Sequence, residues 1–139
     1  MTNTITQDPL ALHAIVSRVS SSSIAAATKK NSFIINDVPV DMRAAADEHM
    51  VATVFGALLN AMITHSNNTC IRVSAKLYGR IVLLHLKESS RFDSTIFASH
   101  LRQVQQLAEK IGGTISISNN QGDATTIVFS FLNNLPAAA

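Results

Sequence analysis

Asn60 is the residue whose type and position most directly suggest chemistry. It interrupts an apolar, helix-like run, GALLNAMITHS over residues 56–66, and Gly56 stands one helical turn before it. Gly56 has no side chain that could bind a metal or orient water. The residues alone leave two interpretations open. Asn60 is an ordinary surface asparagine, or it belongs to a metal–phosphate site that has lost its acid.

The other reactive side chains form no recognisable catalytic or metal site in the sequence. The chain has five histidines and a single cysteine, Cys70. No two histidines have the close helical spacing of a zinc site, and neither a Ser-His-Asp arrangement nor a P-loop is evident. Cys70 fits a small core residue at the start of a strand better than a nucleophile. We therefore expect no metal bound by histidine and no nucleophilic catalysis.

Composition and charge predict one globular domain that binds neither nucleic acid nor a membrane. Of 139 residues, 47% are hydrophobic and 14% charged, and the net charge is +2. The longest basic run is Lys29-Lys30, too short for a nucleic-acid stripe, and no stretch is long and apolar enough to span a bilayer. The first residues lack a basic segment and place Asp8-Pro9 ahead of the apolar ones. We therefore expect no signal peptide and a cytoplasmic protein.

Apolar residues recur with the spacing of helices and strands along most of the chain. Helices are predicted at about 47–65 and 96–111, after a shorter one near 12–19 that serines weaken and residues 24–30 could continue. Strands are predicted at 32–36, 69–77, 81–86, 114–118 and 125–131. This order predicts a two-layer α/β sandwich, with a mixed, mostly antiparallel sheet and helices on one face. The expected core contains Phe55, Leu58, Val82, Leu84, Leu101, Val104, Ile117 and Phe129.

The helical wheel places Asn60 on the side of its helix that faces away from the core. The apolar residues Val51, Phe55 and Leu58 lie opposite, and Gly56 shares the side of Asn60. A glycine inside a helix costs about 1 kcal/mol relative to alanine. That cost reflects either the close approach of another backbone or the loss of a dispensable side chain.

Two stretches together resemble the ATPase domain of histidine kinases, a member of the gyrase/Hsp90/kinase/MutL (GHKL) superfamily. The segment IINDVPVDMRAAADEHMVATVFGALLNAMITHS resembles the region around the N-box, where an aspartate opens a helix that ends in an Asn-Leu-Leu-x-Asn-Ala-type sequence. The segment LAEKIGGTISISNNQGDATTIVFSF resembles the last helix and the terminal hairpin of that domain. The resemblance covers about residues 33–132 and implies a Bergerat-type fold around an ATP and Mg²⁺ site.

The resemblance keeps only part of the site that would hold ATP. The magnesium-binding asparagine of the family falls on Asn60, but the acidic or amide residue one turn earlier falls on Gly56. The lysine that often follows the Asn-Ala pair falls on Ile63. The aspartate that accepts a hydrogen bond from the adenine amino group has its nearest equivalent in Glu88, which we expect in a solvated loop.

The glycine-rich loops of the family are largely replaced. Ser90 and Phe92 stand where glycines should follow the acidic residue, and FASH at 97–100, expected inside a continuous helix, replaces the second glycine box. Gly122 and Thr125 keep half of the Gly-x-Gly-Thr pattern. The nucleotide contacts that the resemblance allows are therefore Asn60, Glu88, Gly122 and Thr125, with Asn60 as the Mg²⁺ ligand. We expect a degenerate site, no bound cofactor, and weak or absent binding of ATP with Mg²⁺.

The expected function is that of a regulatory or protein-interaction module in two-component-type signalling. The resemblance implies a partner such as the helical hairpin of a kinase or a receiver domain, or self-association. The expected contacts are Leu12, Ile15 and Val19 of the N-terminal helix, together with Phe92, which either plugs the vacated pocket or meets a partner. The alternative is a stand-alone ATP-binding protein with kinase or ATPase activity that uses Asn60 and Mg²⁺. The expected organisation is an N-terminal helix and linker (1–31), the ATPase-like domain (32–132) and a flexible tail (133–139).

Overall fold

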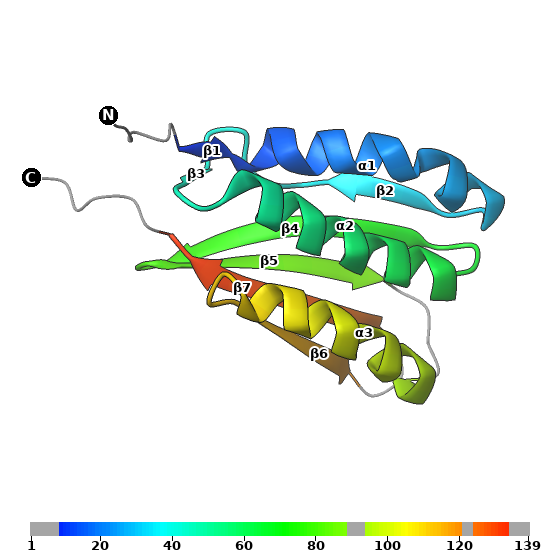
Figure 1. Cartoon of the computed structure of the whole chain (residues 1–139). Coiled ribbons are helices and arrows are strands. Elements are labelled where there is room, and N and C mark those ends of the chain that lie inside the picture. The colour runs from blue at the N-terminus through cyan, green and yellow to red at the C-terminus, as the bar shows by residue number, and fades with distance from the viewer. Residues whose placement is uncertain (1–8, 89–93, 121–123, 134–139) are drawn as a thin grey trace, which may run out of the picture.

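The computed structural model describes residues 9–88, 94–120 and 124–133, which form a helical layer on a sheet (Figure 1). The helices are α1 (Leu12–Lys29), α2 (Glu48–His65) and α3 (Ser94–Glu109). The strands are β1 (Leu10–Ala11), β2 (Phe33–Asn36), β3 (Arg43–Ala44), β4 (Cys70–Tyr78), β5 (Ile81–Glu88), β6 (Thr114–Asn120) and β7 (Ala124–Leu132).

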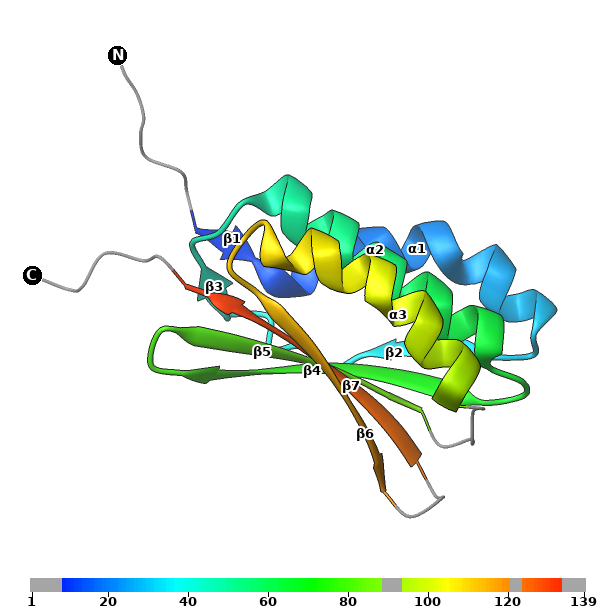
Figure 2. The same cartoon turned by 60° about the horizontal axis from the view of Figure 1, so that its bottom comes forward.

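Five strands form the main sheet, in the order β2-β4-β5-β7-β6. Only the pair of β2 and β4 is parallel, and the other neighbouring strands run antiparallel. The three helices cover one face of this sheet, as the turned view shows (Figure 2). The predicted two-layer sandwich with a mixed, mostly antiparallel sheet is confirmed. The pair of β1 and β3, two residues each, forms a small separate sheet that the sequence pattern did not predict.

The ends of the helices follow from local chemistry. Asp47 begins α2, because its side chain accepts a hydrogen bond of 3.1 Å from the backbone N–H of Met50. The serine run does not interrupt α1, which continues through it to Lys29, and the hydroxyl of Ser21 donates to the carbonyl of Ser17 at 2.8 Å within the helix. After α3, the chain turns through Gly112 with a φ of +70°, and a Cβ on Gly113 would lie 2.7 Å from the carbonyl oxygen of Ser130. Both glycines are therefore required by the backbone.

Helix α1 belongs to the same hydrophobic core as the rest of the chain. Leu12 and Ile15 are 0% and 4% exposed, and both lie in the cluster that also holds the core residues of α2 and the sheet. The expected boundary near residue 31 therefore does not separate two cores. The expectation that Leu12 and Ile15 form an exposed interface is also wrong, because the apolar face of α1 is used inside the domain. Val19, the third residue expected there, is half-buried and packs against this cluster.

Most of the predicted core is buried as expected, with one exception among the eight residues. Ile117 is 37% exposed, although its partner in register, Ile127, is fully buried. Ile117 lies on β6, at the edge of the sheet, where it lines a hollow with Leu101 and Gln105 of α3. The open side of an edge strand leaves this isoleucine partly in contact with water.

Candidate functional site

The outer side of α2 carries the residue that the sequence singled out first. Asn60 is exposed, and its backbone carbonyl accepts a hydrogen bond of 2.8 Å from the hydroxyl of Thr64. Gly56, one turn earlier, faces α1, because a methyl group added there would lie 3.4 Å from Cγ1 of Val19. Ile63 lies seven residues after Gly56, on nearly the same side of the helix, and is 2% exposed. Asn60 and Thr64 thus keep this side of α2 polar, whereas the two neighbouring positions Gly56 and Ile63 are packed against the rest of the domain.

Glu88 does not lie in a solvated loop, as the sequence suggested. It is the last residue of β5, it pairs in register with Ile71 of β4, and it is 0% exposed. It follows Leu84 and Leu86 on the buried face of the strand, which is the face under the helices. Burial raises the pKa of the Glu88 carboxyl from its ordinary value of 4.5 to about 8. At neutral pH, this buried side chain is therefore mostly a neutral acid.

Thr125 joins Glu88 at the same end of the sheet. The two residues are directly paired in the register of β5 and β7, and Thr125 is 1% exposed. Its hydroxyl oxygen is buried and makes no hydrogen bond within the part of the chain that the structure describes. Two residues that the sequence assigned to the nucleotide site, 37 positions apart, are thus brought together. Of the other two, Asn60 lies on α2 in the helical layer, and Gly122 lies outside the described residues, as does Phe92.

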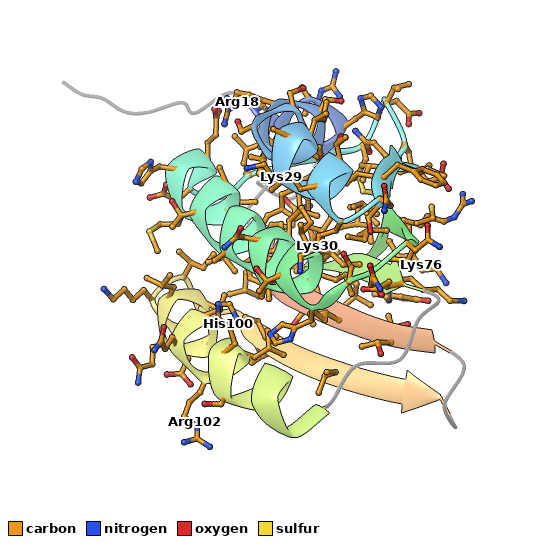
Figure 3. The ribbon with its side chains drawn as sticks, turned by 90° about the vertical axis from the view of Figure 1, so that its right-hand side faces the viewer. Arg18, Lys29, Lys30, Lys76, His100 and Arg102 are labelled. Carbon is orange, nitrogen blue, oxygen red and sulfur yellow. The ribbon has the colours of Figure 1, made fainter. Side chains whose placement is uncertain are left out.

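His65 and His100 form a contact between α2 and α3 that the sequence did not predict. Their ring centroids are 6.0 Å apart and the planes are inclined by 66°, an edge-to-face arrangement. Figure 3 shows His100 in the space between the two helices. The residues are 35 positions apart, so no helical spacing rule could have found them. Residues 97–100, expected in a continuous helix, do lie within α3.

The described part of the chain has neither a cluster of metal-binding side chains nor a membrane-crossing helix. Within it, no three histidine, cysteine, aspartate or glutamate side chains gather in a way that could hold a metal ion. Asn60 remains the residue that the resemblance assigns to Mg²⁺. Among the described helices, none has the length and apolar character needed to cross a membrane.

Comparisons with known proteins point to one fold. No protein-family model matches the chain, and no curated protein matches it in sequence. In structure, it is similar to the histidine kinase AdeS of Acinetobacter baumannii, with a TM-score of 0.78 and 16% identity over 96% of this chain and 70% of that one. It is also similar to the nucleotide-free catalytic domain of the histidine kinase ThkA, with a TM-score of 0.73 and 15% identity over 93% and 98% of the two chains.

A third similar structure is full-length ShkA in complex with AMPPNP, with a TM-score of 0.75 and 13% identity, of which this chain covers 33%. In all three cases nearly the whole of the present chain is matched. The predicted resemblance in fold is therefore confirmed. The chain has the fold of the catalytic ATPase domain of histidine kinases.

Proposed function

We propose that the protein is a regulatory, protein-interaction module of a two-component-type signalling system, in which the nucleotide site of this fold has lost its phosphate chemistry. The observation that carries the proposal is the loss of polar side chains on α2 at two positions close to Asn60. Where the family resemblance calls for a polar side chain and a lysine, Gly56 faces Val19 of α1 and Ile63 is buried. Asn60 alone would have to hold Mg²⁺ and the phosphates, whereas Mg²⁺ favours an octahedral set of oxygen ligands.

A second candidate function, ATP binding with kinase or ATPase activity, is favoured by one specific observation. Glu88, at the position that the resemblance gives to adenine recognition, and Thr125, another of its nucleotide contacts, are buried side by side. A neutral acid and a hydroxyl can both donate and accept hydrogen bonds, so this end of the sheet suits the edge of a base. The two observations divide the site. The base side keeps Glu88 and Thr125, whereas on α2 Asn60 is the one remaining polar position of those that the resemblance gives to the phosphate side.

The proposed partner is a signalling protein of the same kind of system. A crystal structure of one similar protein, ThkA, contains the response regulator protein TrrA, and its likeness to this chain has a TM-score of 0.72 at 15% identity. This supports a receiver domain or a kinase helical hairpin as the partner class. A pairwise two-hybrid screen against the hairpins and receiver domains of the source organism is expected to give at least one specific binder.

Thermal unfolding with different ligands separates the two functions. Ligand at 100 times its dissociation constant stabilises a protein by about 2.7 kcal/mol. We expect millimolar ATP with Mg²⁺ to raise the melting temperature no more than adenosine does. A larger, magnesium-dependent rise with ATP would favour the enzyme, provided that Asn60→Ala abolishes it. Asn67→Ala, which changes another exposed asparagine, is the matched control and should leave any such rise intact.

A further inference from the structure

Strand β2 forms an open edge of the main sheet. Among the strands of the described residues it pairs only with β4, and the backbone N–H groups of Phe33 and Asp37 donate to the carbonyls of Thr69 and Val73 at 3.0 and 2.7 Å. Because the backbone groups of a strand alternate in direction, the N–H groups of Ile34 and Asn36 point away from β4. Phe33–Asn36 contains no charged residue and no proline, the features that usually prevent an edge strand from pairing further.

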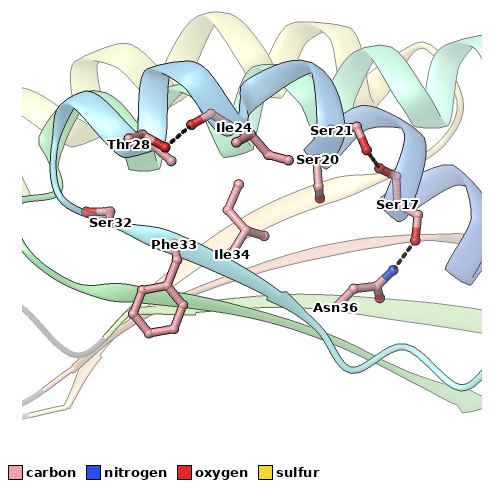
Figure 4. Close-up of a pocket in the computed structure, with 10 residues that line it drawn as sticks. Ser17, Ser20, Ser21, Ile24, Thr28, Ser32, Phe33, Ile34 and Asn36 are labelled. Atoms are coloured by element: carbon pink, nitrogen blue, oxygen red, sulfur yellow. Dashed lines mark hydrogen bonds between the residues drawn. The ribbon is translucent and has the colours of Figure 1, made fainter.

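A groove of about 360 Å³ runs beside this edge, between β2 and the outer side of α1. Its wall on α1 consists mainly of short side chains, and Ile34 and Asn36 line it from β2 (Figure 4). Ser20 is 9% exposed, and its hydroxyl points toward β2 with no hydrogen-bond partner in the described residues. A buried hydroxyl left without a partner costs free energy. The groove therefore has room for a bound segment, and the hydroxyl of Ser20 could form a hydrogen bond with it.

Exposed apolar side chains flank the groove. Ile24 of α1 is 56% exposed and Phe33 of β2 is 58% exposed. A four-residue edge is short for stable pairing on its own, so a partner that bonds to β2 must also cover these two side chains. The partner must therefore offer a strand with an apolar surface beside it. Strand β2 and helix α1 of a second copy of this chain offer both.

The two ends of this edge carry opposite charges. Lys29 and Lys30 lie before β2, at the end of α1 (Figure 3), and both are exposed with no ion pair to the described residues. Asp37 and Asp41 follow β2 and are also exposed, with Asp37 paired to Arg72. If a second copy added its β2 in the antiparallel direction, its acidic end would lie beside the basic end of the first. A two-fold axis makes this contact twice.

We propose that the β2 edge and the adjoining face of α1 are a self-association surface, through which two copies pair their β2 strands antiparallel. The outward N–H and C=O groups of Ile34 and Asn36 bond to those of the second copy. Ile24 and Phe33 become buried, and the lysines of each copy face the aspartates of the other. This surface lies on α1 and β2, and neither Glu88 nor Asn60 takes part. The proposal therefore goes beyond the proposed function and does not depend on it.

Sedimentation velocity of the full chain tests the association. From 1 to 200 µM, the wild type should pass from monomer to dimer, with weaker association as salt is raised. Phe33→Lys should raise the dimer dissociation constant at least tenfold, since a lysine on an edge strand opposes pairing. Tyr78→Lys is the matched control, because Tyr78 is 59% exposed on β4 and lies away from the β2 edge. Its dissociation constant should equal that of the wild type.

A charge exchange tests the direction of the pairing. Lys30→Glu should weaken the dimer, and adding Asp41→Lys should restore it, while circular dichroism shows that all variants melt like the wild type. In hydrogen exchange, the amides of Ile34 and Asn36 should become protected as concentration rises. A wild type that stays monomeric at 200 µM would overturn the proposal. So would equal weakening by Phe33→Lys and Tyr78→Lys, failure of the charge exchange, or dimers whose Ile34 and Asn36 amides stay unprotected.

Discussion

The buried carboxyl of Glu88 makes the stability of the protein depend on pH in a direction that mutation can isolate. In the unfolded chain this group loses its proton near its ordinary pKa of 4.5, whereas in the folded protein burial raises the pKa to about 8. Between these values, the folded state holds one more proton than the unfolded state. The stability contributed by Glu88 protonation is therefore present below pH 4.5 and is lost as pH rises toward 8.

The size of the effect follows from the width of that window. Each pH unit over which one proton separates the two states changes the free energy of unfolding by about 1.4 kcal/mol. Across the whole interval from 4.5 to about 8, the loss comes to about 5 kcal/mol. That is a large part of the 5–15 kcal/mol that is typical of a domain. Glu88→Gln, which cannot ionise, should escape this loss.

Urea unfolding of the wild type and Glu88→Gln at pH 5, 6, 7 and 8 measures the difference. The new amide adds a constant offset, so the prediction concerns the slope. The variant should gain about 4 kcal/mol relative to the wild type between pH 5 and pH 8. Leu86→Val, two residues earlier on the same buried face, is the control and should shift stability equally at every pH. Parallel curves for Glu88→Gln and the wild type would show that the carboxyl is hydrated or ionised in the folded protein, and would refute the reasoning.

Four other substitutions test the packing and the sheet. Gly56→Ala should stabilise the protein by up to about 1 kcal/mol in urea unfolding, because the added methyl would meet Val19 at an ordinary contact distance of 3.4 Å. A lower urea midpoint than that of the wild type would mean that α1 and α2 cannot accommodate the methyl group. Burial lowers the pKa of His85, with a further contribution from a nearby lysine, so this residue opposes folding as pH falls below 6.5. His85→Asn should therefore lose less stability than the wild type between pH 7 and pH 5.5, and an equal loss would contradict this. Leu58→Ala should lower the free energy of unfolding by about 2–5 kcal/mol, whereas Ile117→Ala should lower it by about 1 kcal/mol or less. Similar losses in denaturant titrations would mean that Ile117 is buried in the folded protein.

The elements could be predicted from sequence because their apolar spacing is strong. The face of α2 that holds Phe55 and Leu58 follows from a period of 3.6 residues, and both residues are fully buried. What a helix face packs against does not follow from its period. Leu12 and Ile15 are apolar whether α1 contacts a partner or its own domain, and only the structure shows the second.

The site was less predictable because it depends on register and on contacts between elements. Glu88 stands in the polar stretch KESSRFD, which is typical of a loop, yet β5 continues to this residue because β4 and β7 pair with it. The same register brings Thr125 beside it. The contact of His65 with His100 requires α2 and α3 to be neighbours, and no local pattern carries that information. Asn60 was placed correctly on the outer side, since a helical wheel needs only the helix itself.

The expected tail beginning at residue 133 does not begin there, and this affects where the chain can be shortened or extended. Asn133 is 6% exposed, its backbone N–H donates to the carbonyl of Arg80 at 2.6 Å, and its side-chain oxygen accepts from the N–H of Ala45 at 2.9 Å. One residue therefore fastens the end of β7 to two loops that are far away in sequence. A stop codon in place of Asn133 would leave the Ala45 N–H without this acceptor, so proteases should enter near both loops. A fluorescent protein fused beyond residue 139 would leave both hydrogen bonds of Asn133 in place, whereas one fused directly after Leu132 would remove them.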